Sequence, residues 1–330
     1  AADEFRKNDA DIPVRLVSKD GYLVIRPRLY ERDPETLRAA LRPVLEPIGV
    51  DFVEQPATGI DTDGRTVTLG DGTALAYDRL ILATGSELPP LPVPGAAEHS
   101  WNIDTYEAAV ALDRHLGRLA GDRGAKGRET VVIVGGGMTG IELAAEMRTR
   151  LAVHFGEEHA ATMRVVLIER ANVIGPELGV NPRPVIEQAM AATGVETMLG
   201  TTVSEIGADF VVLADGMRIE TATTVVTVGL RANGLTAQIP GERDAMGRLL
   251  VDDDLQVKGV PGVYATGDVA CAVADEGQFA LMSCQHARTM GKYAGVNAAH
   301  DMLGLDPVSY RQRDYTTCLD LGTFGAMFST

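Results

Sequence analysis

Three glycines carry the clearest chemical signal in the sequence. Gly135, Gly137 and Gly140 follow the spacing G-x-G-x-x-G between a short β-branched run and a stretch with helical spacing. In that setting one glycine permits a tight turn, the next lets the backbone approach a pyrophosphate, and the third allows helix and strand to pack closely. The helix N-terminus adds unpaired N–H groups and a partial positive charge. The pattern predicts a dinucleotide site; the alternative is a glycine-rich loop of an α/β domain without a ligand.

An acidic residue follows at the end of the next expected strand. The carboxylate of Glu169 can accept both ribose hydroxyls of an adenosine and would repel a 2′-phosphate. Its separation from the glycines exceeds the usual distance of about 20 residues, and a polar insertion at 156–161 accounts for the excess. Arg170 comes next and is able to hold a 2′-phosphate. The residues favour NADH over NADPH, and a solvated strand end is the alternative role of Glu169.

Three other polar residues are candidates for chemistry. Asp268 ends the turn Thr266-Gly267-Asp268 after a short apolar strand, where its carboxylate can accept a hydroxyl of a sugar alcohol. Read alone, this is a β-turn. His286 lies at a helix start and is either a packed residue or a catalyst. Glu142 lies in the first turn after the glycines, where the helix dipole favours a carboxylate, or where it would approach a redox ring. The sequence shows no metal-ligand cluster, nucleophile elbow or basic aromatic patch.

The elements that must position these residues form two similar successions. Strand, helix, strand, helix, strand, meander and strand follow one another over 1–112 and again over 128–235. The right-handed crossover rule makes both sheets parallel and doubly wound. The predicted fold is therefore α/β, with two Rossmann-like domains that each carry a β-meander.

Individual elements are expected at defined positions. The patterns predict strands at 12–17, 130–134, 164–169 and 263–265, a loop at 22–30, helices at 34–45, 105–119 and 184–192, a long helix within 278–303, and strands within 314–328. The Asp-Gly pairs at 63–64 and 71–72 are hairpin signals. These elements would place the glycine turn and Glu169 at the same edge of one sheet.

Composition sets bounds on partners and location. The chain has 330 residues, which is enough length for two domains. Its net charge of −16 disfavours nucleic acid and anionic membrane surfaces as partners. Solubility alone also explains the acidity. No apolar run approaches the roughly 18 residues of a membrane span, and no secretory signal is visible. Cys271, Cys284 and Cys318 lack C-x-x-C spacing, which suits a reducing cytosol and argues against a dithiol–disulfide pair.

Several motifs together resemble a known superfamily. Y-D-R-L-I-L-A-T-G at 77–85, G-G-G-M-T-G-I-E at 135–142 and G-V-Y-A-T-G-D at 262–268 are similar to the FAD/NAD(P)-dependent pyridine nucleotide-disulfide oxidoreductases. Y-L-V-I-R-P-R-L-Y-E at 22–31 and S-C-Q-H-A at 283–287 look like type II NADH dehydrogenases (NADH:quinone oxidoreductases) and their bacterial relatives. The resemblance covers nearly the whole chain.

The resemblance implies an NAD(H)-binding domain inserted into an FAD-binding domain. The FAD domain would comprise 1–112 and 239–330, and the NAD(H) domain 113–238. The family opens with a strand and its own G-x-G-x-x-G for the FAD pyrophosphate, and it ends with an amphipathic membrane segment. Residues 1–330 carry neither, so we expect a polypeptide that lacks its opening and has a truncated C-terminal region. Ser18 replaces an expected acid, and C-Q-H-A-R-T-M-G at 284–291 lacks a glutamine implied near the quinone.

The resemblance also implies the reaction and its residues. Hydride would pass from NADH to FAD, and electrons would leave to a quinone or a similar small acceptor. Glu142, close to the nicotinamide, and Gln285, beside the flavin ring, would be the catalytic residues. The predicted cofactor-binding residues are Gly135, Gly137, Met138, Thr139, Gly140, Glu169, Gly229, Arg26, Ala57, Ala83, Thr84, Gly85, Gly267, Asp268 and His286.

Two other functions fit the same motifs. One is a ferredoxin-type NAD(P)H reductase, and the other is an NADH-binding flavoprotein sensor or interaction module that resembles apoptosis-inducing factor. Each of them would bind a nicotinamide nucleotide, together with an electron acceptor for the reductase or a partner protein for the interaction module. Nucleic acid is not an expected partner. The expected location is the cytoplasm. Peripheral contact of the intact protein with the inner face of the membrane is compatible with the motifs, as is a homodimer.

Overall fold

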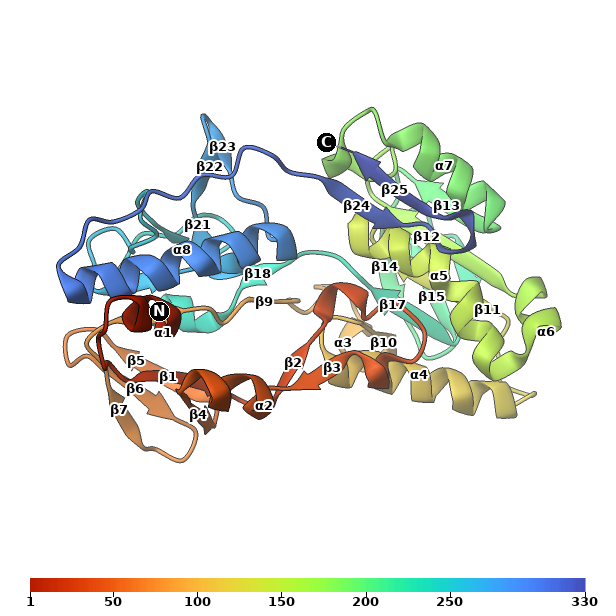
Figure 1. Ribbon diagram of the computed structural model, residues 1–330. Helices are drawn as coiled ribbons and strands as arrows, with labels where there is room; N and C mark the ends of the chain where they lie inside the picture. The colour runs from red at the N-terminus through yellow and green to blue at the C-terminus, as the bar shows by residue number, and fades with distance from the viewer. Residues whose placement is uncertain (330) are drawn as a thin grey trace. The chain divides into compact units, whose positions relative to one another are not determined.

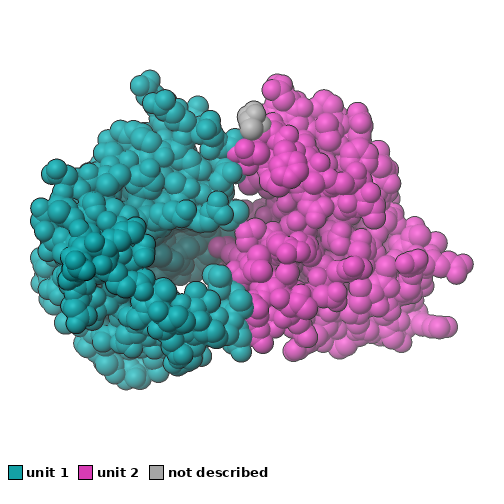
Figure 2. All heavy atoms as spheres, viewed as in Figure 1, with its two compact units in different colours: residues 1–23, 39–87, 230–315 teal, residues 24–38, 88–229, 316–330 magenta. Residues whose placement is uncertain are grey.

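The computed structural model describes residues 1–329. The chain divides into two compact units, shown in different colours in Figure 2. Unit 1 comprises residues 1–23, 39–87 and 230–315, and unit 2 comprises residues 24–38, 88–229 and 316 onward. Each unit is therefore assembled from segments that are far apart in the sequence.

Unit 2 is built on a five-stranded parallel sheet (Figure 1). The strand order is β10-β17-β11-β12-β13. These strands are β10 (Ser100–Trp101), β11 (Thr130–Val134), β12 (Arg164–Glu169), β13 (Val195–Leu199) and β17 (Thr223–Val226). The bounds of β11 and β12 are those that the sequence predicts. Both strands consist almost entirely of buried Val, Ile and Leu, as is typical of parallel strands covered on both faces.

The two faces of this sheet have different covers. Val131 and Ile133 of β11 belong to a core that includes residues of α4, α5 and α7. Val132 and Val134 belong to a second core, formed with the antiparallel meander. The helices are α4 (Tyr106–Gly121), α5 (Met138–Phe155) and α7 (Arg183–Ala192), and the meander strands are β14 (Val203–Ile206), β15 (Phe210–Leu213) and β16 (Arg218–Glu220). Alternate side chains of one strand thus bury against different layers.

A C-terminal hairpin completes unit 2. Its strands are β24 (Thr317–Asp320) and β25 (Ala326–Ser329), which pair antiparallel. Leu319 and Met327 belong to the same core as Leu143 and Met147 of α5. The hairpin therefore covers α5, the helix that follows the glycine turn.

The expected polar insertion before β12 is the short helix α6 (Glu157–Thr162).

Unit 1 contains two longer parallel strand pairs, a meander and several short pairs. The longer pairs are β1 (Val14–Ser18) with β4 (Val50–Glu54), and β8 (Leu80–Leu82) with β20 (Val263–Ala265). The meander is β5 (Ala57–Asp61), β6 (Thr66–Leu69) and β7 (Ala74–Ala76), joined at the two predicted Asp-Gly turns. Helices α1 (Ala2–Lys7) and α8 (Cys284–Leu303) belong to this unit. The short pairs are β9 (Ser86–Glu87) with β18 (Arg231–Ala232), β19 (Leu249–Leu250) with β21 (Ala270–Cys271), and β22 (Val273–Asp275) with β23 (Gln278–Phe279). Of these short pairs, β19 with β21 is also parallel.

Two predictions about residues 22–45 are wrong. The expected helix at 34–45 is a 3-10 turn η2 (Pro34–Thr36), a strand β3 (Arg38–Ala40) and one helical turn α2 (Arg42–Leu45). The expected loop at 22–30 contains β2 (Tyr22–Val24) and a 3-10 turn η1 (Arg26–Arg28). Pro43 lacks an N–H group, so it can begin a helix and cannot continue one. Strand β3 instead pairs with β2, an arrangement that local periodicity does not indicate.

Candidate functional site

The glycine turn joins the end of β11 to the start of α5. Gly137 is the N-cap of α5, and Gly135 has φ 114°, a conformation that disfavours other residues. A Cβ on Gly140 would lie 1.8 Å from the carbonyl oxygen of Gly135. The hydroxyl of Thr227 donates to the carbonyl oxygens of Val134 and Gly135, both at 3.1 Å. The turn therefore leaves main chain bare for a ligand, as expected for a pyrophosphate cradle, and these residues fit a dinucleotide.

Glu169 lies directly beside this turn. Its Oε2 accepts the N–H of Gly136 and its Oε1 accepts the N–H of Ala171, both at 2.8 Å. The side chain is buried, with 8% of the residue exposed. A carboxylate oxygen has more than one acceptor site, so both oxygens can accept hydroxyls in addition. The structure brings the predicted ribose ligand and the predicted phosphate cradle together at one edge of the sheet.

A second carboxylate at the turn escaped the sequence analysis. Oε1 of Glu177 accepts the N–H of Met138, the first residue of α5, at 3.0 Å. Glu177 lies in the 3-10 turn η4 (Pro176–Leu178). The two residues are 39 positions apart, and no local pattern marks such a contact.

Glu142 is held beneath the C-terminal hairpin. Its Oε1 accepts the N–H of Asp320 at 3.2 Å, and the hydroxyl of Tyr30 donates to Oδ2 of Asp320 at 3.3 Å. The pKa of Glu142 is raised to about 8, chiefly by burial; the bond from the Asp320 amide opposes this rise, and the carboxylates of Asp320 and Glu31 add to it. A carboxyl group with such a pKa can hold and release a proton near neutral pH.

Arg26 lies on a segment that is anchored inside unit 2. Its guanidinium pairs with the carboxylate of Asp104 and donates from Nε to the Asp104 carbonyl oxygen at 3.0 Å. The fully buried Arg150 donates to the carbonyl oxygens of Leu29 at 3.3 Å and Tyr30 at 3.4 Å. The buried guanidinium of Arg150 thus fixes the stretch that carries Arg26.

Gly229, with φ 75°, is the last residue of the unit 2 segment 88–229.

Unit 1 brings the Ala83-Thr84-Gly85 and Thr266-Gly267-Asp268 motifs together. They follow the paired strands β8 and β20, and the Thr266 N–H donates to the Leu82 carbonyl oxygen at 3.0 Å. Ser86 donates its hydroxyl proton to Oδ2 of Asp268 at 2.6 Å. Gly85 has φ 70° and Gly267 has φ 68°, so both turns use glycine conformations.

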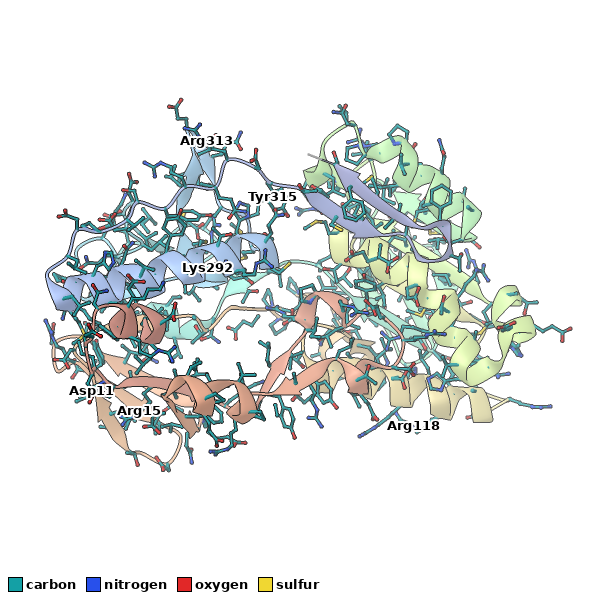
Figure 3. All side chains as sticks on the ribbon, viewed as in Figure 1. Asp11, Arg15, Arg118, Lys292, Arg313 and Tyr315 are labelled. Atoms are coloured by element: carbon teal, nitrogen blue, oxygen red, sulfur yellow. The ribbon has the colours of Figure 1, made fainter. Side chains whose placement is uncertain are left out.

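Helix α8 begins against the second of these turns. A Cβ on Gly267 would lie 3.3 Å from Cβ of Ala287. Ser283 caps α8 by accepting the N–H of His286 at 3.3 Å, and its hydroxyl lies 3.1 Å from Nδ1 of the same ring. The His286 ring is buried and stacks on Tyr315 with centroids 4.8 Å apart; Figure 3 labels Tyr315 on the segment after α8. Burial lowers the pKa of His286. The ring is already packed, whereas its neighbour Gln285 is half-buried.

The residues of unit 1 fit a flavin nucleotide. Oγ1 of Thr266 is buried and has no hydrogen-bond partner among the described residues, so it is available to a ligand. The Asp268 carboxylate is positioned by Ser86 beside it. Ala57 opens β5, and its backbone pairs in register with Leu69 of β6. The residues that could hold FAD would be the two glycine-containing turns and Asp268, which accepts hydroxyls.

Residues 1–329 contain neither a membrane-spanning helix nor a metal-binding cluster. No helix there has the length and apolar character needed to cross a membrane. In the same residues, no group of His, Cys, Asp or Glu side chains is arranged to hold a metal ion. Cys271 is buried, Cys284 and Cys318 are exposed, and all three are thiols.

A unit with a nucleotide-binding glycine turn, joined to one that fits a flavin nucleotide, defines a class of oxidoreductase that uses both cofactors. Residues 9–291 match the pyridine nucleotide-disulphide oxidoreductase family, and the chain belongs to this family. The predicted superfamily is thereby confirmed. The protein is an enzyme, an FAD-dependent NAD(P)H dehydrogenase or reductase, and the predicted α/β fold class is confirmed as well.

Three similar proteins illustrate the match. The NADH dehydrogenase-like protein Rv1812c of Mycobacterium tuberculosis is 44% identical over 99% of this chain and 82% of its own length. The demethylphylloquinone reductase NdbB of Synechocystis is 30% identical over 95% of this chain and 78% of its own. The solved structure of NDH2 from Plasmodium falciparum in complex with NADH has a TM-score of 0.79 at 13% identity, covering 96% of this chain and 85% of that one. The last likeness concerns the fold alone.

Proposed function

We propose that the enzyme oxidises NADH through FAD and reduces a quinone or a similar small acceptor. The observation that carries the choice of NADH is the Glu169 carboxylate, buried beside the glycine turn and fixed at 2.8 Å by the Gly136 amide. A negative group there accepts ribose hydroxyls and repels a 2′-phosphate. The relatives named as NADH dehydrogenase-like and as a demethylphylloquinone reductase support the donor and the acceptor.

The proposed domains are an FAD-binding domain, 1–112 with 239–330, and an inserted NAD(H)-binding domain, 113–238. The two compact units have other bounds, because residues 24–38, 88–112 and 316 onward lie in unit 2 and residues 230–238 lie in unit 1. The assembly of unit 1 from segments on either side of residues 88–229 supports this insertion. We place the enzyme in the cytoplasm. Reduction of a membrane quinone would require peripheral contact of the enzyme with the inner face of the membrane. The formation of a homodimer stays a prediction.

The residues of the chain have distinct roles in this proposal. The glycine turn and the start of α5 hold the pyrophosphate of NADH, and Glu169 holds its ribose. Asp268 orients the flavin nucleotide and Gln285 lies beside the flavin ring, and Arg26 stays a predicted cofactor-binding residue of unit 2. When bound, FAD supplies the redox chemistry by accepting a hydride and passing electrons on. Glu142 holds or releases a proton, because its raised pKa keeps both forms populated near neutral pH.

A spectrum and a binding comparison test the proposal. We expect the purified intact protein to show flavin absorbance and to oxidise NADH rapidly when quinone is added. Glu169→Ala should weaken the binding of NADH more than that of NADPH, because the lost carboxylate favours the former and repels the latter. Equal losses would contradict the role of Glu169. Absence of flavin from both the protein and its denatured supernatant would refute the FAD assignment, and a long-lived reduced flavin with slow turnover would indicate a sensor.

A further inference from the structure

The carboxylate of Glu177 occupies the start of α5, where a pyrophosphate would bind. Its Oε1 accepts the Met138 N–H at 3.0 Å, and a Cβ on Gly137 would lie 2.8 Å from the same oxygen. The first N–H groups of a helix have no partner within the helix. They attract an anion together with the helix dipole. Glu177 and the pyrophosphate therefore need the same donor.

The two carboxylates at this turn are held very differently. Glu169 is buried and accepts two backbone N–H groups. Glu177 is exposed, and among the described residues one hydrogen bond, from the Met138 N–H, ties its side chain to the turn. Movement of the Glu177 side chain away from the Met138 N–H would therefore break that hydrogen bond, while Leu178 of the same turn can stay packed against the core.

The backbone around Glu177 suits such a movement. Its 3-10 turn is flanked by Gly175 with φ 56° and Gly179 with φ 79°. Gly175 is tied to the glycine turn, because its N–H donates to the Gly136 carbonyl oxygen at 2.9 Å. A Cβ on Gly179 would meet nothing within 4 Å. One end of the segment is anchored and the other is open, so Glu177 can swing away and still remain close to the site.

We infer that Glu177 is a specificity-determining residue, an internal anion that competes with the nucleotide for the N-terminus of α5. The inference rests on the proposed NADH site. Because the displaced carboxylate stays on a short turn beside the bound nucleotide, it repels ligands in proportion to their negative charge. NADPH carries one more phosphate than NADH and is disfavoured more. Glu177 thus lowers the affinity for both nucleotides and widens the difference between them.

The test compares Glu177→Gln with a matched control. Glutamine keeps the size and the acceptor oxygen and removes the charge. Glu158→Gln removes the same charge from an exposed position on α6. Dissociation constants for NADH and NADPH are measured by fluorescence titration at low and high salt. We expect Glu177→Gln to bind NADH roughly three- to tenfold more tightly and NADPH by a larger factor, with both gains smaller at high salt. The control should match the wild type.

A structural readout accompanies the binding measurements. Glu177→Ala leaves the Met138 N–H without its acceptor, so hydrogen exchange of that amide should accelerate in the nucleotide-free protein. If the wild type binds NADH and Glu177→Gln binds it equally or more weakly, the inference is overturned and the proposed function stands. Failure of wild type, variant and control to bind NADH would overturn both.

Discussion

Replacement of Glu142 by glutamine should change how the stability of unit 2 depends on pH. The carboxyl group lies under the C-terminal hairpin, where it is partly buried and accepts the Asp320 N–H at 3.2 Å. Glutamine preserves the acceptor and the volume, and it stays neutral at every pH. The substitution therefore isolates the cost of ionising this one group.

The size and direction of the effect follow from the pKa. Burial raises the pKa of Glu142 from its ordinary value of 4.5 to about 8. Between these values the folded protein binds the proton and the unfolded chain does not, so stability is full below about pH 4.5, falls as the pH rises and levels off above about pH 8. The folded and unfolded pKa values differ by about 8 minus 4.5, which is about 3.5. Because a difference of one in pKa corresponds to about 1.36 kcal/mol, ionisation of Glu142 lowers the free energy of unfolding by at most about 5 kcal/mol.

Urea unfolding and hydrogen exchange from about pH 5 to about pH 9 measure this effect. Exchange is followed in peptides from α5 and from the β24–β25 hairpin, with Glu158→Gln as the control. We expect Glu142→Gln to match the wild type at the acidic end and to be more stable at the alkaline end, with slower exchange in both peptides. A difference in stability that is the same at every pH would refute the assignment of the proton to Glu142.

Two further substitutions probe the cofactor sites separately. Gly140→Ala would place a methyl group 1.8 Å from the Gly135 carbonyl oxygen, so the turn must deform. We expect the affinity for NADH, measured by fluorescence titration, to fall by about tenfold or more. The flavin content of the protein should not change. Unchanged affinity would show that the turn does not hold the nucleotide. Asp268→Ala removes the carboxylate that accepts the Ser86 hydroxyl at 2.6 Å. We expect much less FAD to copurify, measured as flavin absorbance per protein, and full occupancy would argue against this role of Asp268.

Local chemistry made part of the dinucleotide site predictable. The residues of β11 and β12 are a β-branched and apolar run that suits a strand buried on both faces, so their bounds agree with prediction. The spacing of Gly135, Gly137 and Gly140 follows from steric demands within a few residues of chain. The same kind of reasoning failed at 34–45, where prolines and the pairing of β2 with β3 outweighed an apparent helical pattern.

The family, the parallel α/β architecture and the position of the glycine turn could be predicted from the amino-acid sequence, because they depend on short-range spacing and on the apolar pattern of individual strands. The folded chain was needed to show that Glu177 accepts the Met138 N–H, 39 residues away, and that Glu142 accepts the Asp320 N–H, 178 residues away. Such contacts depend on which surfaces pack together, and a raised pKa depends on the water that this packing excludes. Neither leaves a pattern in neighbouring residues.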